Sequence, residues 1–199
     1  MTGLRSMMLI AGARVPAASG RVLPAINPYD RTQIATIPDA AATDVNAAVC
    51  AAQEAFVEWR AVSGLHRARL MHNLADAMER DADRLGEMES RDNGKLVRET
   101  TTQARFSARN YRYFAGYADK LYGKSIPLDD RDKLDYTLRE PVGVAALITA
   151  WNSPMQLLAN KLAPALAAGN CVVVKPSEHA SLTTLVMAEL LEEAGFPPG

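Results

Sequence analysis

Residues 140–199 read EPVGVAALITAWNSPMQLLANKLAPALAAGNCVVVKPSEHASLTTLVMAELLEEAGFPPG, and this stretch decides the fold. Two short apolar runs, Gly143–Ile148 and Cys171–Val174, predict buried strands. Each run precedes a segment with helical spacing, Pro154–Ala168 after the first and Ser181–Ala194 after the second. The order strand, helix, strand, helix predicts two parallel strands joined by a right-handed crossover.

A polar loop follows each predicted strand, Thr149–Ser153 after the first and Lys175–Glu178 after the second. Because parallel strands present their carboxyl ends at one edge of a sheet, we expect the two loops to lie side by side. Open α/β sheets bind their ligands at this edge, so the sequence predicts a ligand site there.

Five sequence blocks in this region stand in a fixed order and spacing. They are Glu140–Val144, Ala150–Pro154, Lys161–Asn170, Lys175–Glu178 and Ala194–Gly199. Together they resemble the aldehyde dehydrogenase superfamily, and five blocks in register are far more specific than any one of them. The likeness extends upstream through Asn27-Pro28, Asp44 to Trp59 and Asp92 to Lys95, so it covers most of the chain.

The resemblance implies an incomplete aldehyde dehydrogenase-like fold of the α/β class. Its centre would be a Rossmann-like parallel sheet with flanking helices, from which an antiparallel hairpin protrudes. We expect three parts. Residues 1–122 would form strands and helices that pack on the cofactor-binding domain, 123–142 an oligomerisation hairpin, and 143–199 the first βαβα part of the dinucleotide-binding domain.

The composition is that of an ordinary soluble globular protein, with 199 residues, 48% hydrophobic and 23% charged residues, and a net charge of -1. Neither a basic excess nor a run of roughly 20 apolar residues is present, so we expect no nucleic-acid and no membrane partner. Cys50 and Cys171 lie in strongly patterned segments without metal-type spacing. We expect both to pack inertly in the core of a cytoplasmic protein, and the sequence identifies no metal ligands.

Upstream, the expected elements are hairpins or edge strands over residues 8–38 and helices over 44–59, 66–93 and about 97–122. Thr43 or Asp44 can cap the first helix, in which Trp59 is a core anchor. The second helix continues past Asp81 and stops at Asn93-Gly94. Leu121 is expected on the inner face of the third.

The segment between Gly123 and Glu140 predicts a half-exposed antiparallel strand after a charged turn, because Leu134, Tyr136 and Leu138 alternate with polar residues. Such a hairpin leaves backbone groups unpaired unless another chain covers it. The resemblance implies a homodimer or homotetramer built through this segment. A solvated surface hairpin is the alternative that the residues alone favour equally.

Asn152 stands directly after the first strand and before a proline suited to the first turn of a helix. From the residues alone, a helix N-cap is the favoured role. The resemblance implies instead that the Asn152 amide is half of an oxyanion hole, a donor whose removal typically costs about 2.7 to 4 kcal/mol of transition-state stabilisation.

Lys175 and Glu178 offer ammonium donors and a carboxylate acceptor to the two hydroxyls of an adenosine ribose. A carboxylate there disfavours an added 2′-phosphate, so NAD is expected rather than NADP. The alternative is a surface ion pair that contributes under about 1 kcal/mol to the stability of the fold. The resemblance places eight residues against the cofactor: Ile148, Thr149, Ala150, Trp151, Lys175, Pro176, Ser177 and Glu178.

The reaction implied by the resemblance oxidises a small-molecule aldehyde to a carboxylic acid through a cysteine thioester, with a glutamate that activates water. Neither of these two groups is recognisable here, so we expect this chain alone to be inactive. Lys161 would support catalysis electrostatically, although a lysine on such an apolar helix usually extends along its edge.

Two other interpretations compete with this one. The chain could be a non-catalytic relic or interaction module that keeps the hairpin and associates with other subunits. It could also be an unrelated doubly wound binding domain that uses the same sheet edge for another nucleotide.

Overall fold

The computed structural model describes residues 4–198, and its centre is a pair of parallel strands. Strand β8 (Val144–Ile148) pairs with β9 (Cys171–Lys175), in register from Val144 opposite Cys171 to Ile148 opposite Lys175. Helix α5 (Pro154–Ala167) connects them, and α6 (Leu182–Glu193) follows β9. The predicted order and the parallel pairing are confirmed.

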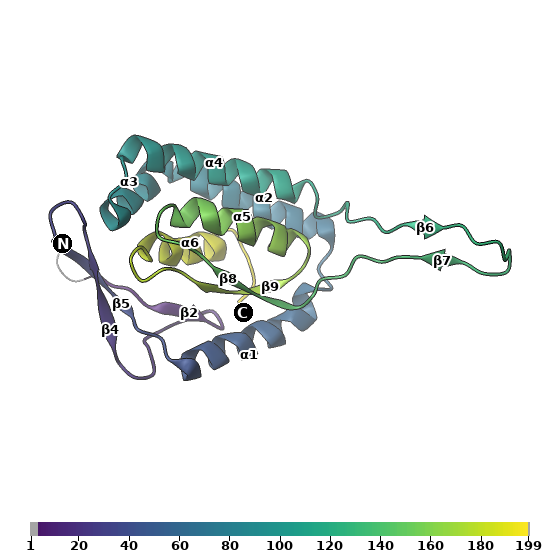
Figure 1. The fold of residues 1–199 in the computed structure, drawn as a ribbon, viewed down its shortest axis with the longest axis horizontal. Helices are drawn as coiled ribbons and strands as arrows, with labels where there is room; N and C mark the ends of the chain where they lie inside the picture. The colour runs from purple at the N-terminus through teal and green to yellow at the C-terminus, as the bar shows by residue number, and fades with distance from the viewer. Residues whose placement is uncertain (1–3, 199) are drawn as a thin grey trace.

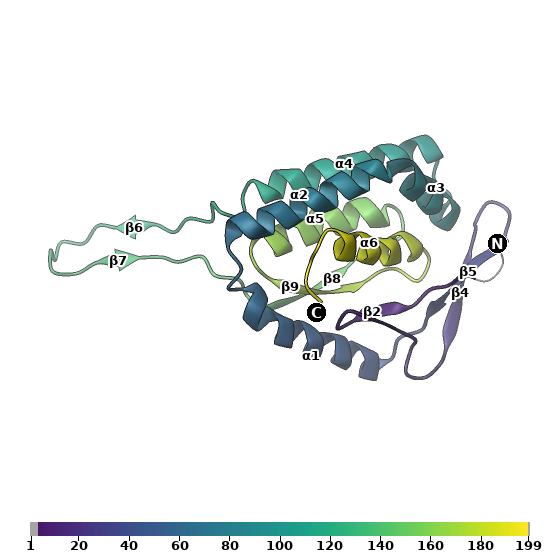
Figure 2. The same ribbon diagram turned by 180° about the vertical axis from the view of Figure 1, so that it is seen from behind.

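Helices enclose this sheet in layers, as Figures 1 and 2 show from opposite sides. Helix α1 (Ala42–Trp59) lies on one face of the sheet, and α5 and α6 lie on the other. A further layer packs outside α5; it consists of α2 (Gly64–Arg80), α3 (Ala82–Asn93) and α4 (Val97–Ala115). The α/β class and the flanking helices are therefore as predicted.

The amino-terminal strands form two small sheets beside this stack. The first joins β1 (Leu4–Arg5), β5 (Gln33–Pro38) and β4 (Val22–Ile26) in that order, and the second pairs β2 (Met8–Ile10) with β3 (Ala13–Val15). Pairs β2–β3 and β4–β5 are antiparallel, which agrees with the predicted hairpins.

The main core lies between the outer layer of α2, α3 and α4, helices α5 and α6, and the sheet, and Trp59 of α1 closes one end of it. Trp59 is buried, and its ring lies 5.7 Å from the ring of Phe196, so its expected role as a core anchor is confirmed. Helices α3 and α4 cross closely at Gly86, where an added Cβ would lie 2.2 Å from the Thr101 hydroxyl oxygen.

Three of the predicted helix boundaries are wrong, namely the start of α1, the continuity at Asp81 and the end of α4. Helix α1 is capped by neither Thr43 nor Asp44: its N-cap is Ala41, whose backbone N–H donates to Asp44 Oδ2 at 2.8 Å. The other Asp44 carboxylate oxygen accepts the Ala18 N–H, so this side chain ties the helix start to the preceding strands. These two bonds hold the pKa of Asp44 below its usual value.

The continuous second helix is also wrong, because the chain divides into α2 and α3 at Asp81. Asp81 leaves helical geometry, and its carboxylate accepts from Arg80 and Arg84 on either side. Helix α4 ends at Ala115 rather than Tyr122, since tighter backbone bonds follow its C-cap; Leu121 is consequently 42% exposed instead of facing inward.

Cys50 does not pack in the core, contrary to expectation, whereas Cys171 does. Helix α1 covers the sheet with a narrow stripe that includes Ala52 and Trp59, and Cys50 lies outside that stripe on the exposed side. Both cysteines are free thiols.

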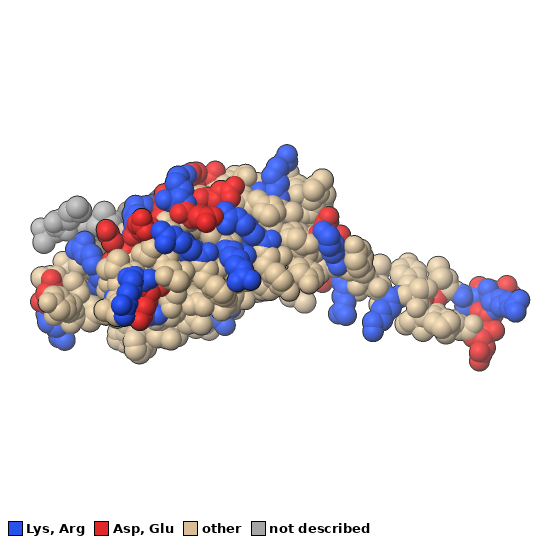
Figure 3. Space-filling view, turned by 90° about the horizontal axis from the view of Figure 1, so that it is seen from above, with Lys and Arg blue, Asp and Glu red and all other residues tan. Residues whose placement is uncertain are grey.

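Residues 123–142 form an arm that leaves the body of the molecule (Figures 1 and 3). Strands β6 (Ser125–Ile126) and β7 (Asp135–Tyr136) pair antiparallel, and the charged turn lies at the tip. The expectation that its apolar face would be half covered is wrong within one chain, because Leu134 is 79% and Leu138 69% exposed. Among residues 4–198, neither leucine belongs to a hydrophobic cluster of the body.

Within residues 4–198, no helix combines the length and the apolar character needed to cross a bilayer.

Candidate functional site

The two predicted loops meet at the carboxyl edge of the β8–β9 pair. The backbone N–H of Thr149 donates to the carbonyl of Lys175 at 3.2 Å, one step beyond the last registered pair of the strands. The chain therefore begins both loops from the same point of the sheet. The expected adjacency of the loops is confirmed.

In the first loop, the N-cap interpretation of Asn152 is wrong. The N-cap of α5 is Ser153, with Pro154 in the first turn, and Ser153 makes no side-chain capping bond. Asn152 is exposed, and no partner within residues 4–198 bonds to its side-chain amide. The amide is thus available to an external acceptor.

A residue of another helix accepts a backbone N–H at the start of α5. The Met155 N–H donates to Glu89 Oε2 at 3.1 Å, although Glu89 lies on α3 and 66 positions away in the sequence. Glu89 is fully buried, and burial raises the pKa of its carboxyl group to about 7. Its other oxygen, Oε1, has no hydrogen-bond partner in the described part of the chain.

Asp92 plays the same part for α6, the helix that follows the second loop. Its Oδ2 accepts the Leu182 N–H at 2.8 Å, and burial raises the pKa of this carboxyl group to about 6. Helix α3 thus supplies two carboxylates, at helical spacing, to the starts of two other helices. Sequence reasoning missed both roles; the only signal was acidic residues at buried positions of an amphipathic helix.

The end of α3 also holds the first loop. Asn93 Nδ2 donates to the carbonyl of Trp151 at 3.3 Å, and Lys95 Nζ donates to Ser153 Oγ at 3.0 Å. Gly94 between them has a φ of 81°, the left-handed conformation that ends the helix and turns the chain toward the loop. Asn93 and Lys95 were recognised as part of a family block, but not as neighbours of Asn152.

In the second loop, the Lys175 ammonium lies 3.4 Å from Glu178 Oε2, and both side chains are more than half exposed. A backbone hydrogen bond and then Lys175 lower the pKa of Glu178, so the carboxylate is charged at neutral pH. Pro176 and Ser177 are partly buried between them. The pair stands open to a ligand that offers both a donor and an acceptor.

The remaining predicted cofactor residues belong to the strand end and the first loop. Thr149 is buried, and its hydroxyl has no partner within the described residues. Ala150 is exposed, as are the apolar side chains of Ile148 at 68% and Trp151 at 54%. Exposed apolar surface beside a charged donor–acceptor pair fits the adenosine end of a dinucleotide.

The structure does not bring Lys161 to either loop. Lys161 is exposed on α5, roughly 12 Å along the helix axis from Ser153, and no acidic side chain of the described residues pairs with it. Its exposure agrees with the edge position expected from the apolar helix.

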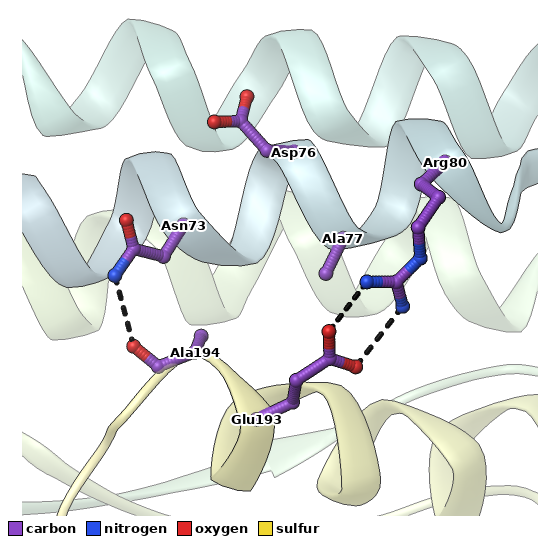
Figure 4. Close-up of a pocket in the computed structure, with 6 residues that line it drawn as sticks. All are labelled: Asn73, Asp76, Ala77, Arg80, Glu193 and Ala194. Carbon is purple, nitrogen blue, oxygen red and sulfur yellow. Dashed lines mark hydrogen bonds and ion pairs between the residues drawn. The ribbon is translucent and has the colours of Figure 1, made fainter.

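Two hollows in the surface of residues 4–198 include no predicted site residue. One, of about 320 Å³, lies between α2 and α6. Figure 4 shows it spanned by the Arg80–Glu193 ion pair and by a hydrogen bond of 3.2 Å from Asn73 Nδ2 to the Ala194 carbonyl. These contacts join the two helices. The other hollow, about 480 Å³, is bordered by Phe56 of α1 and Val144 of β8.

Comparisons with known proteins agree on one family. The model of the aldehyde dehydrogenase family matches residues 15–199. Among curated relatives, (Z)-2-((N-methylformamido)methylene)-5-hydroxybutyrolactone dehydrogenase of Acinetobacter baylyi is 46% identical over 176 residues, which is 87% of this chain and 36% of the relative.

Solved structures give the same result. The aldehyde dehydrogenase of Brucella melitensis biovar abortus 2308 superposes with a TM-score of 0.96 and 32% identity, over 98% of this chain and 40% of that one. A betaine aldehyde dehydrogenase of Staphylococcus aureus in complex with NAD+ superposes with a TM-score of 0.94 and 35% identity, over the same shares. This chain therefore spans well under half the length of the proteins it matches.

Proposed function

The chain belongs to the aldehyde dehydrogenase family, and on that premise we propose that it forms the amino-terminal part of an NAD-dependent enzyme that oxidises an aldehyde to a carboxylic acid through a cysteine thioester. One observation carries the proposal: Asn152 and the Lys175–Glu178 pair follow two strands that are paired in register, so that both open onto one sheet edge.

In this proposal Asn152 acts on the aldehyde oxygen. Attack by a thiolate places negative charge on that oxygen, and an amide N–H held beside it stabilises the charge without reorganisation. The exposed and unpaired Asn152 amide supports this role. Lys161 is exposed on α5 and would add positive charge to the site from its position along that helix.

The second loop would hold the adenosine ribose of the cofactor, with the Lys175 ammonium donating to one hydroxyl and the Glu178 carboxylate accepting from the other. The cofactor supplies a hydride acceptor when it is bound. The lowered pKa of Glu178 supports NAD over NADP, because a fixed negative charge repels a 2′-phosphate. Ile148, Thr149, Ala150, Trp151, Pro176 and Ser177 would complete this half of the cofactor site.

The 199-residue chain should not catalyse the reaction unaided. Cys171 is buried and its pKa is raised by burial, which disfavours the thiolate; Cys50 is exposed but lies on α1, across the sheet from α5. We propose that the nucleophilic cysteine and the glutamate that activates water belong to the portion of the family fold that this chain does not span.

Two measurements test the proposal. The coding sequence after the Gly199 codon can be searched for a Phe-x-x-x-Gly-Gln-x-Cys stretch, and the product can be assayed for aldehyde-dependent reduction of NAD. The isolated chain should bind NAD, with chemical-shift changes at Lys175 and Glu178, and should reduce none. Aldehyde-dependent reduction by the isolated chain would contradict its proposed inactivity, and shifts confined to other residues would contradict the cofactor site.

The exposed arm favours a second candidate function, that of an oligomerisation module without catalysis. Leu134, Tyr136 and Leu138 present an apolar row that a neighbouring subunit could cover. Size-exclusion chromatography of the chain, alone and with a full-length relative, tests this second function. An oligomerisation module should co-elute with the relative. An activity assay should then show that the relative oxidises its aldehyde at an unchanged rate. In either case we propose a homodimer or homotetramer in the cytoplasm, a reducing setting that free thiols suit.

A further inference from the structure

Asn152 is held through its neighbours rather than through its own side chain. Asn93 binds the carbonyl of Trp151, the residue before it, at 3.3 Å, and Lys95 binds the hydroxyl of Ser153, the residue after it, at 3.0 Å. Both donors come from the corner between α3 and α4. Two neighbouring side chains thus form hydrogen bonds to the loop on both sides of Asn152.

A third hydrogen bond holds the residues that follow the loop. The Glu89 carboxylate accepts the N–H of Met155 at 3.1 Å, three positions beyond Asn152. Residues 89, 93 and 95 therefore bind residues 155, 151 and 153, so that one short segment, here called the α3 brace (residues 89–95), spans the whole loop. The Glu89 bond is buried and the Lys95 bond is partly buried, whereas the Asn93 bond to Trp151 lies at the surface. The first two are therefore better protected from water than the third.

We propose that Asn93 and Lys95 are positioning residues that fix the direction of the Asn152 amide, an inference that rests on the oxyanion role proposed above. An oxyanion donor must be free of partners before the reaction and yet held in place. A bond to the amide itself would have to be broken during catalysis. Bonds to the carbonyl before it and the hydroxyl after it leave the amide free while restricting the backbone that carries it.

The Ser153 hydroxyl links Lys95 to the backbone of Asn152. This hydroxyl accepts from Lys95 and donates to the carbonyl of Asn152 at 2.6 Å, so the Lys95 ammonium orients a hydroxyl that in turn bonds the backbone of Asn152 itself. A charged donor polarises this short chain of hydrogen bonds. Lys95 thus acts on Asn152 through one intermediary, and Asn93 acts through a backbone carbonyl.

The test uses the isotope-labelled 199-residue chain and follows the side-chain amide signal of Asn152 by NMR. Asn93→Asp keeps the oxygen that accepts the Lys95 N–H at 3.0 Å but removes the donor to Trp151. Lys95→Met keeps the apolar stem and removes the ammonium. Each variant should shift and broaden the Asn152 amide signal, because the backbone that carries the side chain loses one hydrogen bond.

The matched control is Asn73→Asp, which removes a bond of the same kind, from Asn73 Nδ2 to the Ala194 carbonyl at 3.2 Å, between α2 and α6 (Figure 4). It should leave the Asn152 signal unchanged, so a general loss of stability is distinguished from a local effect. Lys95→Arg, which can still reach Ser153, should restore the signal. If Asn93→Asp does not fold, Lys95→Met and Lys95→Arg still decide the question.

An Asn152 amide signal that is the same in the parent chain, Asn93→Asp and Lys95→Met would overturn the positioning role. None of these readouts needs an aldehyde or NAD. A parallel titration with NAD therefore separates the two ideas: if NAD does not bind but the Asn152 signal responds to the variants, the loop is positioned as proposed and the proposed function is wrong.

Discussion

The backbone N–H of Thr149 and the carbonyl of Lys175 form a hydrogen bond of 3.2 Å that joins the first residue after β8 to the last residue of β9. This bond extends the strand ladder into the loops and sets their spacing. The Asn152 loop and the Lys175–Glu178 pair consequently begin at adjacent points of the sheet.

Asn152→Ala should leave the free energy of unfolding unchanged within about 0.5 kcal/mol, because the Asn152 side chain is exposed and makes no bond within residues 4–198. In an active enzyme containing this chain, the same change should lower kcat about a hundredfold to a thousandfold. Urea unfolding of the chain measures the first quantity. A loss of about 1 kcal/mol or more would restore the helix-capping role for Asn152.

Glu178→Gln should weaken NAD binding about fivefold to tenfold and narrow the preference for NAD over NADP, because it removes a charged acceptor and the repulsion of a 2′-phosphate. The ion pair with Lys175 is exposed, so stability should change by less than about 0.5 kcal/mol. Titration calorimetry with both cofactors measures the preference.

The control for this variant is Glu192→Gln on α6, which removes a less exposed ion pair, with Arg14 at 2.6 Å, away from the loops. It should leave both affinities unchanged. Equal effects of the two variants would show that Glu178 acts only through overall charge.

The buried Glu89 should make the chain less stable as pH rises. Burial raises the pKa of Glu89 from 4.5 to about 7, so between these values the folded chain keeps a proton that the unfolded chain releases. The free energy of unfolding contributed by this group therefore falls as pH rises from 4.5 to 7, by a total on the order of 3 kcal/mol. Asp92, with a pKa raised from 3.8 to about 6, acts in the same direction.

Glu89→Gln keeps an oxygen that can accept the Met155 N–H but removes the titration. Urea unfolding at several pH values between 4.5 and 8 should show a flatter profile for the variant than for the parent chain. If the free energy of unfolding depended on pH in the same way for both chains, the pKa of Glu89 would be the same in the folded and unfolded states.

Gly86→Ala should destabilise the chain by about 2 to 3 kcal/mol, because the added Cβ would lie 2.2 Å from Thr101 Oγ1 and 2.7 Å from its backbone. The two helices would have to separate. Gly116→Ala is the control: its φ is −63°, and the nearest atom to an added Cβ is 3.3 Å away, so its effect should stay within about 1 kcal/mol. Similar losses for both variants would argue against the close helix crossing.

Thiol reactivity should divide sharply between the two cysteines. Cys50 is exposed, whereas Cys171 is buried with a raised pKa, so a disulfide reagent should modify one thiol rapidly in the folded chain and the second only after unfolding. Cys50→Ser should abolish the rapid phase. Two rapid thiols would show that β9 is accessible in solution.

The sequence was sufficient to predict the parallel pair because apolar runs and helical spacing recur in simple order from Gly143 to Ala194, and the observed boundaries differ by at most one or two residues. It was insufficient wherever a boundary depends on a distant partner. Asn152 is a good N-cap by type, but buried Glu89 already satisfies the Met155 N–H. That competition arises between residues far apart in sequence, which local propensity does not register.

The same limit explains the other differences. Asp44 lies near a helix start as expected, yet its second oxygen binds Ala18 and places it inside the first turn rather than before it. Cys50 has the pattern of a core residue, but only a narrow side of α1 meets the sheet. In both cases tertiary contacts, rather than sequence spacing, determine which atoms are covered.

The pairing of β8 with β9 alone has a practical consequence. Each of these strands has one partner among residues 4–198, so the outward-facing N–H and C=O groups of both remain open to hydrogen bonding. Edge strands with open backbone groups are templates for the addition of another strand. In concentrated solution the isolated chain should self-associate through intermolecular pairing of these edge strands. A short peptide with high β-propensity that pairs with either edge should keep the chain monomeric.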